Sequence, residues 1–221
     1  MVERRPSIAR EDYLQTIRQL EEEGAPIIRA RLADRLQVSA PSVSEATRSL
    51  VDDGLLEIAD NRELRLTPPG VELADNVVRR HRVAERILTD LLRLPWHIAH
   101  EEAHKLEHGL SDRVVDAALV VLGNPTTCPH GSPIPGTGYE PPKLVPLTDL
   151  KAGTAFVLQQ LGEGIEVQRD VLEYLEEKGF TPGSDGTVTA VAPDGTLSVD
   201  VSGTALAIGA SEAARMYATV H

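Results

Sequence analysis

The sequence predicts a mainly α-helical protein that ends in a small β domain. Helical patterns of apolar residues occupy the first 53 positions, and a short hairpin pattern follows them. Further helical patterns run from residue 68 to residue 122, and short β segments replace them after residue 147. This order predicts a winged helix-turn-helix, then a helical domain, then a small all-β barrel.

The N-terminal pattern predicts three helices and a wing. Residues 8–23 carry apolar side chains at helical spacing, and Gly24 can end that helix. The third helix is expected to begin at Ser39, a good N-cap, with Pro41 in its first turn. Two short alternating segments around Asp60 predict a β-hairpin. Three helices followed by a hairpin are typical of a winged helix-turn-helix.

The rest of the chain divides at its proline-rich segment. Helices are expected at 68–93, 96–108 and 111–122, with Trp96 as a core residue or helix-start anchor, and a proline- and glycine-rich loop follows. After residue 147 only one short helix, 169–178, interrupts the β segments. We therefore expect a winged helix-turn-helix domain at 1–74, a helical domain at 75–136, a linker at 137–146 and the barrel at 147–221.

Composition indicates the cellular setting. The single cysteine, Cys128, excludes an intramolecular disulfide and fits a reducing cytosol. The first residues are charged, and no apolar run approaches the roughly 20 residues of a membrane span. We therefore expect a cytoplasmic protein with no membrane partner. We also expect no small-molecule substrate.

Charge is distributed unevenly. The formal net charge is −12, of which −7 falls in residues 147–221, whereas the window 26–51 has a net charge of +2. An acidic whole chain therefore does not exclude a local DNA-binding face. Side chains of the second and third helices and of the wing are the candidates for phosphate and base contact. These candidates are Arg29, Ser39, Pro41, Ser42, Ser44, Glu45, Arg48, Arg62 and Arg65.

Histidines and glutamates at one-turn spacing predict a metal site. His100, His104 and His108 are spaced by four with Glu107 beside them, and the preceding helix carries an equivalent pair, His81 and Glu85. Two such helices make a metal site more probable than two solvated faces. The run HKLEH also matches H-x-x-E-H of a zinc protease family, in which the glutamate is a general base. A protease would need a substrate cleft, for which the sequence gives no signature.

Five motifs, in order, resemble the diphtheria toxin repressor family of bacterial iron- or manganese-dependent repressors. They are RARLADRLQVSAPSVSEATRSLVDDGLL, NRELRLTPPG, RRHRVAERILTDLL, HEEAHKLEHGLSD and GSPIPG. The resemblance spans essentially the whole chain and implies an SH3-like barrel at its end. It also implies a homodimer that binds double-stranded operator DNA, with metal setting the spacing of the two recognition helices. On this reading the H-x-x-E-H run binds a sensed metal.

The resemblance implies two metal sites. The primary site corresponds to Asp12, His104, Glu107 and His108. The ancillary site corresponds to His81, Glu85 and His100, completed by barrel residues for which Glu166, Gln168 and Asp170 are candidates. Iron-responsive members have Met and Cys at the positions of Asp12 and His104. Because hard donors suit Mn²⁺, we expect Mn²⁺ as cofactor, with Fe²⁺ as the alternative and Co²⁺ or Zn²⁺ binding in vitro.

Other departures leave alternatives open. Manganese-responsive members have a second carboxylate where this chain has Gln15, and iron repressors have Gln where Glu45 stands. One sequence does not distinguish a repressor from a metal-dependent activator. Cys128 and His130 form a C-x-H pair that we interpret as a packed thiol and a surface imidazole, with a third metal site as the alternative.

Overall fold

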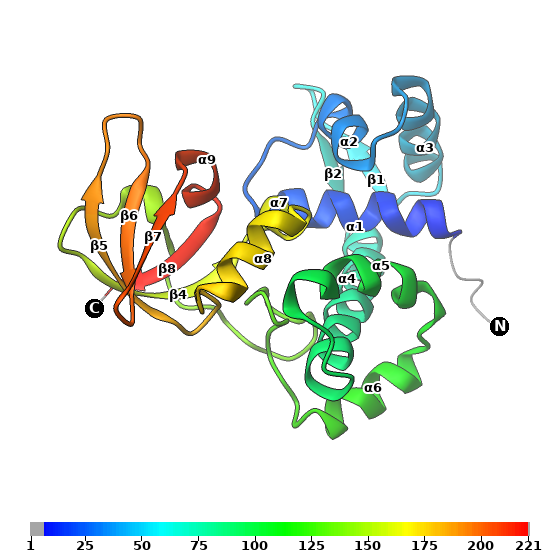
Figure 1. Ribbon diagram of the computed structural model, residues 1–221. Helices are drawn as coiled ribbons and strands as arrows, with labels where there is room; N and C mark the ends of the chain where they lie inside the picture. Colours follow the sequence, from blue (N-terminus) through cyan, green and yellow to red (C-terminus); the bar gives the residue numbers. More distant parts are fainter. Residues whose placement is uncertain (1–6, 221) are drawn as a thin grey trace. The chain divides into compact units, whose positions relative to one another are not determined.

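The structure is a computed structural model that describes residues 7–220. It divides into two compact units, Met1–Arg80 and His81–His221. The long helix α4 (Pro68–Arg86) begins in the first unit and ends in the second. Figure 1 shows the labelled helices and strands of both units, coloured from blue near the N-terminus to red near the C-terminus.

The first unit is the predicted winged helix-turn-helix. Its elements are α1 (Ile8–Glu22), α2 (Arg29–Leu36), α3 (Ala40–Asp52), β1 (Leu56–Ile58), β2 (Leu64–Leu66) and the first turns of α4. Strands β1 and β2 pair antiparallel, as the hairpin pattern predicted. An aliphatic cluster that includes Leu14, Leu32, Leu50 and Leu64 forms the core and is fully buried.

Local signals define the edges of this unit. The Ser39 hydroxyl accepts a hydrogen bond from the amide of Ser42, so Ser39 is the N-cap of α3 as predicted.

Two ion pairs join α1 to α4. Arg80 binds Glu11 at 2.6 Å between side chains that are both almost fully buried. Arg18 binds Asp75 at 2.7 Å.

The helical part of the second unit differs from the expected pattern in two places. The predicted helix 68–93 is α-helical only to Arg86 and continues as a π-helical turn, Ile87–Leu91. Helix α5 (Trp96–Leu106) then leads into a 3₁₀ turn, Glu107–Gly109, and α6 (Asp112–Val121) follows. Aliphatic side chains from these helices form a second core, which consists of Val83, Ala84, Leu88, Ala103, Leu110, Val115, Leu119 and Ile134.

The C-terminal part is a six-stranded antiparallel sheet in the order β3-β8-β4-β5-β6-β7. The strands are β3 (Val145–Pro146), β4 (Ala155–Leu161), β5 (Asp185–Val191), β6 (Leu197–Val201), β7 (Thr204–Ile208) and β8 (Met216–Val220). Helices α7 (Glu163–Glu166) and α8 (Arg169–Glu177) are inserted after β4, and α9 (Ala210–Ala213) precedes β8. This is the small SH3-like domain, so the predicted fold class is confirmed.

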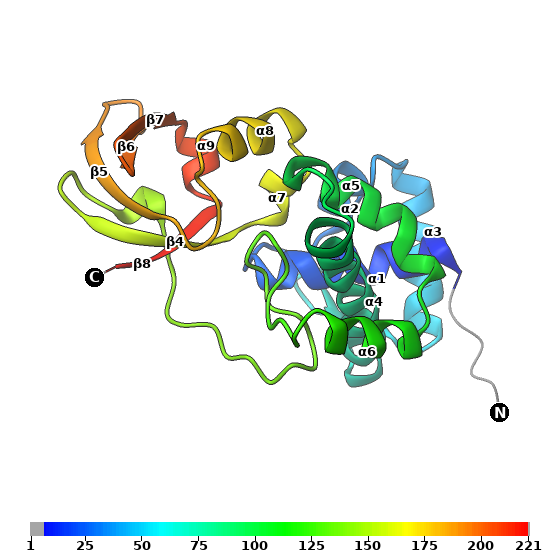
Figure 2. The same ribbon diagram turned by 60° about the horizontal axis from the view of Figure 1, so that its bottom comes forward.

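Helix α8 has two neighbours. Leu172 and Leu175 point into the core of the sheet, where they join Phe156 and Phe180. On another side α8 packs beside α5, as both views show (Figures 1 and 2). The barrel is therefore in direct contact with the helix that carries the histidines. Within residues 7–220, no helix is both long enough and apolar enough to cross a membrane.

Candidate metal centre

The carboxylate of Glu85 lies at the centre of a buried cluster of donors. His81, one turn earlier on α4, places its Nε2 3.2 Å from Glu85 Oε1. His100 reaches the same oxygen from α5 with its Nδ1, also at 3.2 Å. The facing nitrogens of the two imidazoles are themselves only 3.2 Å apart. The structure thus brings together the three ancillary-site residues that the resemblance placed on these helices.

The loop after α6 adds two donors that the sequence interpretation did not place here. One donor atom from each of Glu85, Cys128, His130 and Glu166 lies within 4.8 Å of the others. His130 Nδ1 is 3.2 Å from Glu85 and 3.3 Å from Glu166. The expectation of a surface imidazole is therefore wrong. His130 is fully buried, because the ring of Trp96 lies over it at 4.7 Å between centroids.

The barrel contributes carboxylates from α7. Glu166 Oε2 lies 3.2 Å from His100 Nδ1, and Glu163 Oε2 lies 3.9 Å from the same nitrogen. Glu163 was not a candidate, because the sequence pattern gave no sign of the short helix on which it lies. Gln168 stays outside the cluster, since its amide donates to the carbonyl of Gly164 at 2.5 Å. Asp170 is exposed on α8.

Unpaired polar atoms indicate that this cluster suits a cation. Buried side-chain atoms in residues 7–220 without a hydrogen-bond partner include Glu85 Oε2, His100 Nε2, Glu166 Oε1 and His130 Nε2. A buried polar atom left unpaired is costly, and a bound divalent ion removes that cost by accepting several lone pairs at once. Carboxylate, imidazole and thiolate donors are the ligands that transition metals use. The residues present therefore fit a metal ion.

In this cluster, neighbouring opposite charges and hydrogen bonds shift the pKa values of the carboxylates and of His100 more than burial does. Burial raises the pKa of Glu85, but the neighbouring His130 and His81 hold that pKa well below its usual range. The same competition, with His130 as the strongest charge, lowers the pKa of Glu166 to about 2. Burial lowers the pKa of His100, but hydrogen bonds to Glu166 and Glu85 raise it to about 9. The two carboxylates are thus anionic and ready to bind a cation.

The thiol of Cys128 is protonated in the absence of metal. Burial, reinforced by the charge of Glu85, raises the pKa of Cys128 to about 12. The thiolate is the form that ligates metal, so binding of an ion through this sulfur would release a proton.

Two arginines of α4 hold the loop that carries Cys128. Arg86 donates through Nε to the carbonyl of Thr127 at 2.8 Å and through Nη2 to the carbonyl of Cys128 at 3.1 Å. One turn earlier, Arg82 donates to the carbonyl of Pro133 at 2.5 Å. Both ends of the loop are thereby fixed to the helix that carries Glu85.

A second donor group lies at the C-terminal end of α5. The α-helix ends at Leu106, so Glu107 and His108 occupy the 3₁₀ turn and do not continue one helical face. Glu107 Oε1 is 3.4 Å from His104 Nδ1 and 3.4 Å from His108 Nε2. Its other oxygen lies 2.5 Å from His81 Nδ1 and so links the two donor groups. Asp12 lies on α1 in the first unit, and its membership of this ligand set stays a prediction.

The recognition helix and wing present most of the predicted DNA-binding residues to solvent. Exposed residues are Ser39, Pro41, Ser42, Glu45 and Arg48 on or before α3, together with Arg62 and Arg65 in the hairpin. Ser44 is half-buried. Arg29 is also half-buried, and its Nε donates to Thr47 Oγ1 at 3.1 Å. Arg29 therefore braces α2 against α3.

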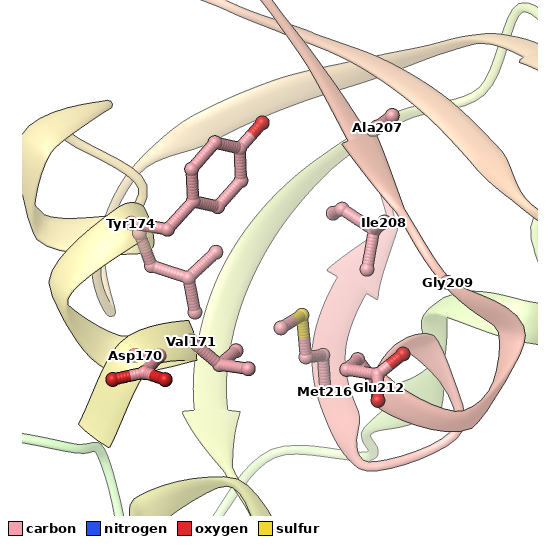
Figure 3. Close-up of a pocket in the computed structure, with 9 residues that line it drawn as sticks. Asp170, Val171, Tyr174, Ala207, Ile208, Gly209, Glu212 and Met216 are labelled. Atoms are coloured by element: carbon pink, nitrogen blue, oxygen red, sulfur yellow. The ribbon is translucent and has the colours of Figure 1, made fainter. Parts of the chain in front are cut away.

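A separate pocket of about 280 Å³ lies in the barrel. Figure 3 shows Val171 and Tyr174 of α8 on one side, facing Ile208 and Met216 across an apolar space. Asp170 lies at its edge. The lining contains no histidine or cysteine, so this pocket is distinct from the donor cluster.

A winged helix-turn-helix with an exposed recognition helix, joined to a buried cluster of metal donors, defines a metal-dependent DNA-binding regulator. Comparison with known families agrees for each of the three domains. The iron dependent repressor N-terminal DNA binding domain matches residues 7–64, and the iron dependent repressor metal binding and dimerisation domain matches residues 67–136. The FeoA domain matches residues 145–220.

Relatives that span most of the chain are also metal-dependent repressors by name. The iron-dependent repressor IdeR of Mycobacterium tuberculosis is 43% identical over 204 residues, covering 87% of this chain and 88% of the relative. The diphtheria toxin repressor of Corynebacterium diphtheriae is 36% identical over 202 residues, with coverage of 87% and 88%. The solved structure of a manganese-dependent transcriptional repressor in complex with manganese superposes with a TM-score of 0.87 at 30% identity, covering 96% of this chain and 100% of that one.

The chain belongs to the diphtheria toxin repressor family and is a metal-dependent DNA-binding transcription repressor. The family consists of transcription repressors, so the H-x-x-E-H run is not the active site of a protease.

Proposed function

We propose that this protein is a manganese-activated repressor that binds operator DNA as a homodimer in the cytoplasm and controls genes of metal homeostasis. The donor set that we assign to the activating site supports this proposal. It consists of His104, Glu107 and His108, with Asp12 as the fourth ligand, and it contains no sulfur. Oxygen and imidazole donors suit Mn²⁺, whereas a thiolate or thioether favours softer ions.

The buried cluster is the ancillary site in this proposal. Its ligands are drawn from two overlapping groups of donors, Glu85, Cys128, His130 and Glu166 in one and His100, Glu163 and Glu166 in the other, with His81 beside them. Gln168 is not among them. Because α7 belongs to the barrel and α4 and α5 do not, an ion held here ties the barrel to the helical domain. Metal binding thereby stabilises one arrangement of the second unit.

An iron-responsive repressor is the second candidate. The soft thiol of Cys128 in the buried cluster favours it, as does the 43% identity to an iron-dependent repressor. The two candidates differ in the metal that activates DNA binding, so one titration separates them.

The dimer proposal rests on apolar side chains left exposed in the second unit. Those with the largest exposed fractions on and before α6 are Leu91, Leu92, Val114, Val120 and Val121, which are 45–69% exposed. Contiguous exposed apolar residues mark association surfaces. These residues fall in or next to the segment that matches the dimerisation domain.

The test is an anaerobic operator-binding titration. An operator fragment is first isolated from genomic DNA by retention on the manganese-loaded protein. We then measure the Mn²⁺ and the Fe²⁺ concentration needed for half-maximal binding. The natural protein should need less Mn²⁺ than Fe²⁺, and the double variant Asp12→Met, His104→Cys should move the ratio toward Fe²⁺. Lys105→Cys, which adds a thiol on the exposed side of the same helix, should leave the ratio unchanged.

Two results would contradict the proposal. A natural protein that needs less Fe²⁺ than Mn²⁺ identifies the iron-responsive candidate. Equal operator affinity in chelator and in saturating metal would show that neither ion activates the protein.

A further inference from the structure

The first turn of α5 is capped by a carboxylate from the barrel. Glu176, on α8, accepts a hydrogen bond from the amide of Trp96 at 3.0 Å through Oε1 and one from the amide of His97 at 3.3 Å through Oε2. The same Oε2 lies 2.5 Å from Nδ1 of the His97 ring. One side chain, 80 residues away in sequence, thus makes three contacts with the start of the histidine-bearing helix.

Helix α5 has no cap of its own. The residue at its N-cap position is Pro95, which offers no side-chain hydrogen bond. The first amides of a helix lack partners within the helix and carry a partial positive charge, so an anionic acceptor stabilises them. Glu176 supplies both the hydrogen bonds and the charge. Its pKa is lowered despite partial burial, because it accepts bonds from the His97 side chain and from the two backbone amides.

Trp96 extends this contact to the metal-binding loop. Its ring packs against the apolar core of the barrel, and its Nε1 donates to the carbonyl of Pro129 at 3.2 Å. The centroid of the same ring lies 4.7 Å from that of the His130 ring, and the two ring planes are tilted by 44°. The corner formed by Glu176, Trp96 and His97 therefore touches the barrel, α5 and the loop together.

These are the three segments whose relative position decides whether the buried donors converge. His100 comes from α5, His130 from the loop and Glu166 from the barrel, and their donor atoms approach within 3.2–3.3 Å. A shift of α8 along α5 would carry α7, and with it Glu166, away from both imidazoles. The distance from Trp96 to His100 is about one helical turn, so the cap acts close to the donors.

We propose that Glu176 is a positioning residue for the buried metal site. By capping α5 from the barrel, it acts as a latch that holds α8 beside α5, in the position where Glu166 lies next to His100 and His130. The inference rests on the proposed function, because it requires that the cluster bind metal. Glu176 itself touches no metal donor.

The experiment compares Glu176→Ala with Glu177→Ala in the full chain. Glu177 is the next residue of the same helix and is exposed, so its removal is a matched loss of charge. Glu176→Gln is the conservative variant, because its amide oxygen can still accept one backbone hydrogen bond. Trp96 is the only tryptophan, so fluorescence excited at wavelengths that tyrosine does not absorb reports this corner alone.

Two readouts separate the latch from the metal assignment. In metal-free protein, the Trp96 emission of Glu176→Ala should shift to longer wavelength as the ring becomes hydrated, while Glu177→Ala keeps the natural spectrum. In a Co²⁺ titration followed by thiolate-to-cobalt absorption from Cys128, Glu176→Ala should need about tenfold more Co²⁺ for half-saturation, as is typical when a ligand's supporting contact is lost. Glu177→Ala should stay within roughly twofold, and Glu176→Gln should lie between the two.

Each outcome has one meaning. If Glu176→Ala and Glu177→Ala agree in both readouts, the latch is overturned. An emission shift without a change in Co²⁺ requirement shows a latch that does not position the metal site, which also overturns the inference. If the natural protein gives no thiolate-to-cobalt absorption, the assignment of Cys128 in the proposed function fails. The Co²⁺ requirement of the same three variants is then measured by isothermal titration, and equal requirements overturn the latch.

Discussion

Cys128 shows how strongly the surroundings of a single residue decide its role. In sequence it is a lone thiol in a loop, and in the fold it lies beside Glu85, His130 and Glu166 with its side chain fully buried. A thiol with a pKa of about 12 is unreactive toward oxidants, so burial protects the ligand until a metal displaces its proton.

A serine at this position tests that role. Cys128→Ser keeps the size of the side chain but removes the soft donor. We expect the thiolate-to-cobalt absorption to disappear and the affinity of the buried site for Co²⁺ to fall by about 10- to 100-fold, the range seen when a metal site loses a supporting group. Mn²⁺ affinity should fall less, because Mn²⁺ gains less from sulfur. Isothermal titration with each ion measures both effects, and unchanged cobalt absorption would contradict the assignment.

The two carboxylates of α7 should differ in importance. Glu166 approaches His100 and His130 at 3.2 and 3.3 Å, whereas Glu163 lies 3.9 Å from His100 and 3.8 Å from Arg82. Burial also raises the pKa of Glu163 to about 7, so part of its population is neutral. We expect Glu166→Gln to weaken metal binding about tenfold more than Glu163→Gln. Competition with a chromogenic chelator gives both affinities, and equal losses would show that Glu163 is an equivalent ligand.

At the scale of elements, the wing and the recognition helix both expose side chains that can contact DNA, and the wing carries two of the exposed positive charges. Arg62 and Arg65 are exposed in the hairpin, whereas Arg29 is engaged with Thr47 within the unit. The wing arginines are therefore exposed cations suited to phosphate contact, and Arg48 is an exposed cation of the recognition helix.

Removing the wing charges should change the salt dependence of operator binding. We expect Arg62→Ala together with Arg65→Ala to reduce the slope of log affinity against log salt by about 2, one for each lost phosphate contact. The preference for operator over unrelated DNA should stay the same, because phosphate contacts carry no sequence information. Anisotropy titrations at four salt concentrations measure the slope. Arg93→Ala, which lies outside the DNA-binding unit, is the control and should leave the slope unaltered.

At the scale of the whole molecule, the exposed apolar face of α6 predicts self-association. Val114→Asp with Val121→Asp places two charges on that face, and burying them in an interface would be costly. Sedimentation of this variant should show a species near 23.9 kDa, while the natural protein sediments as a dimer. Lys143→Asp, an exposed change in the linker, should leave the dimer intact. A variant that still dimerises would place the interface elsewhere.

The same variant separates assembly from metal binding. Each chain contains a complete buried cluster, so the thiolate-to-cobalt absorption should survive in the monomer. Operator affinity should be lost, because two recognition helices must reach successive major grooves together.

The sequence by itself determined the architecture and the metal helices. Helical spacing, the Ser39 cap and the hairpin around Asp60 are local signals, and the structure places each where it was predicted. The pair His81 and Glu85, and the run from His100 to His108, were found because one-turn spacing is visible in the residues themselves. Even so, the end of α5 at Leu106 was not visible, because no glycine or proline marks it.

Only the tertiary structure decided which distant groups complete the buried site. Glu163 and Glu166 lie on a four-residue helix too short to have a pattern, and Gln168, their neighbour, turns back to its own backbone. His130 was expected at the surface because loops are usually exposed. Here two arginines of α4 hold the loop inward and Trp96 covers it. The donors come from α4, α5, the loop after α6 and α7, and they meet only because these four segments pack together. The spacing of residues along the chain does not specify that packing.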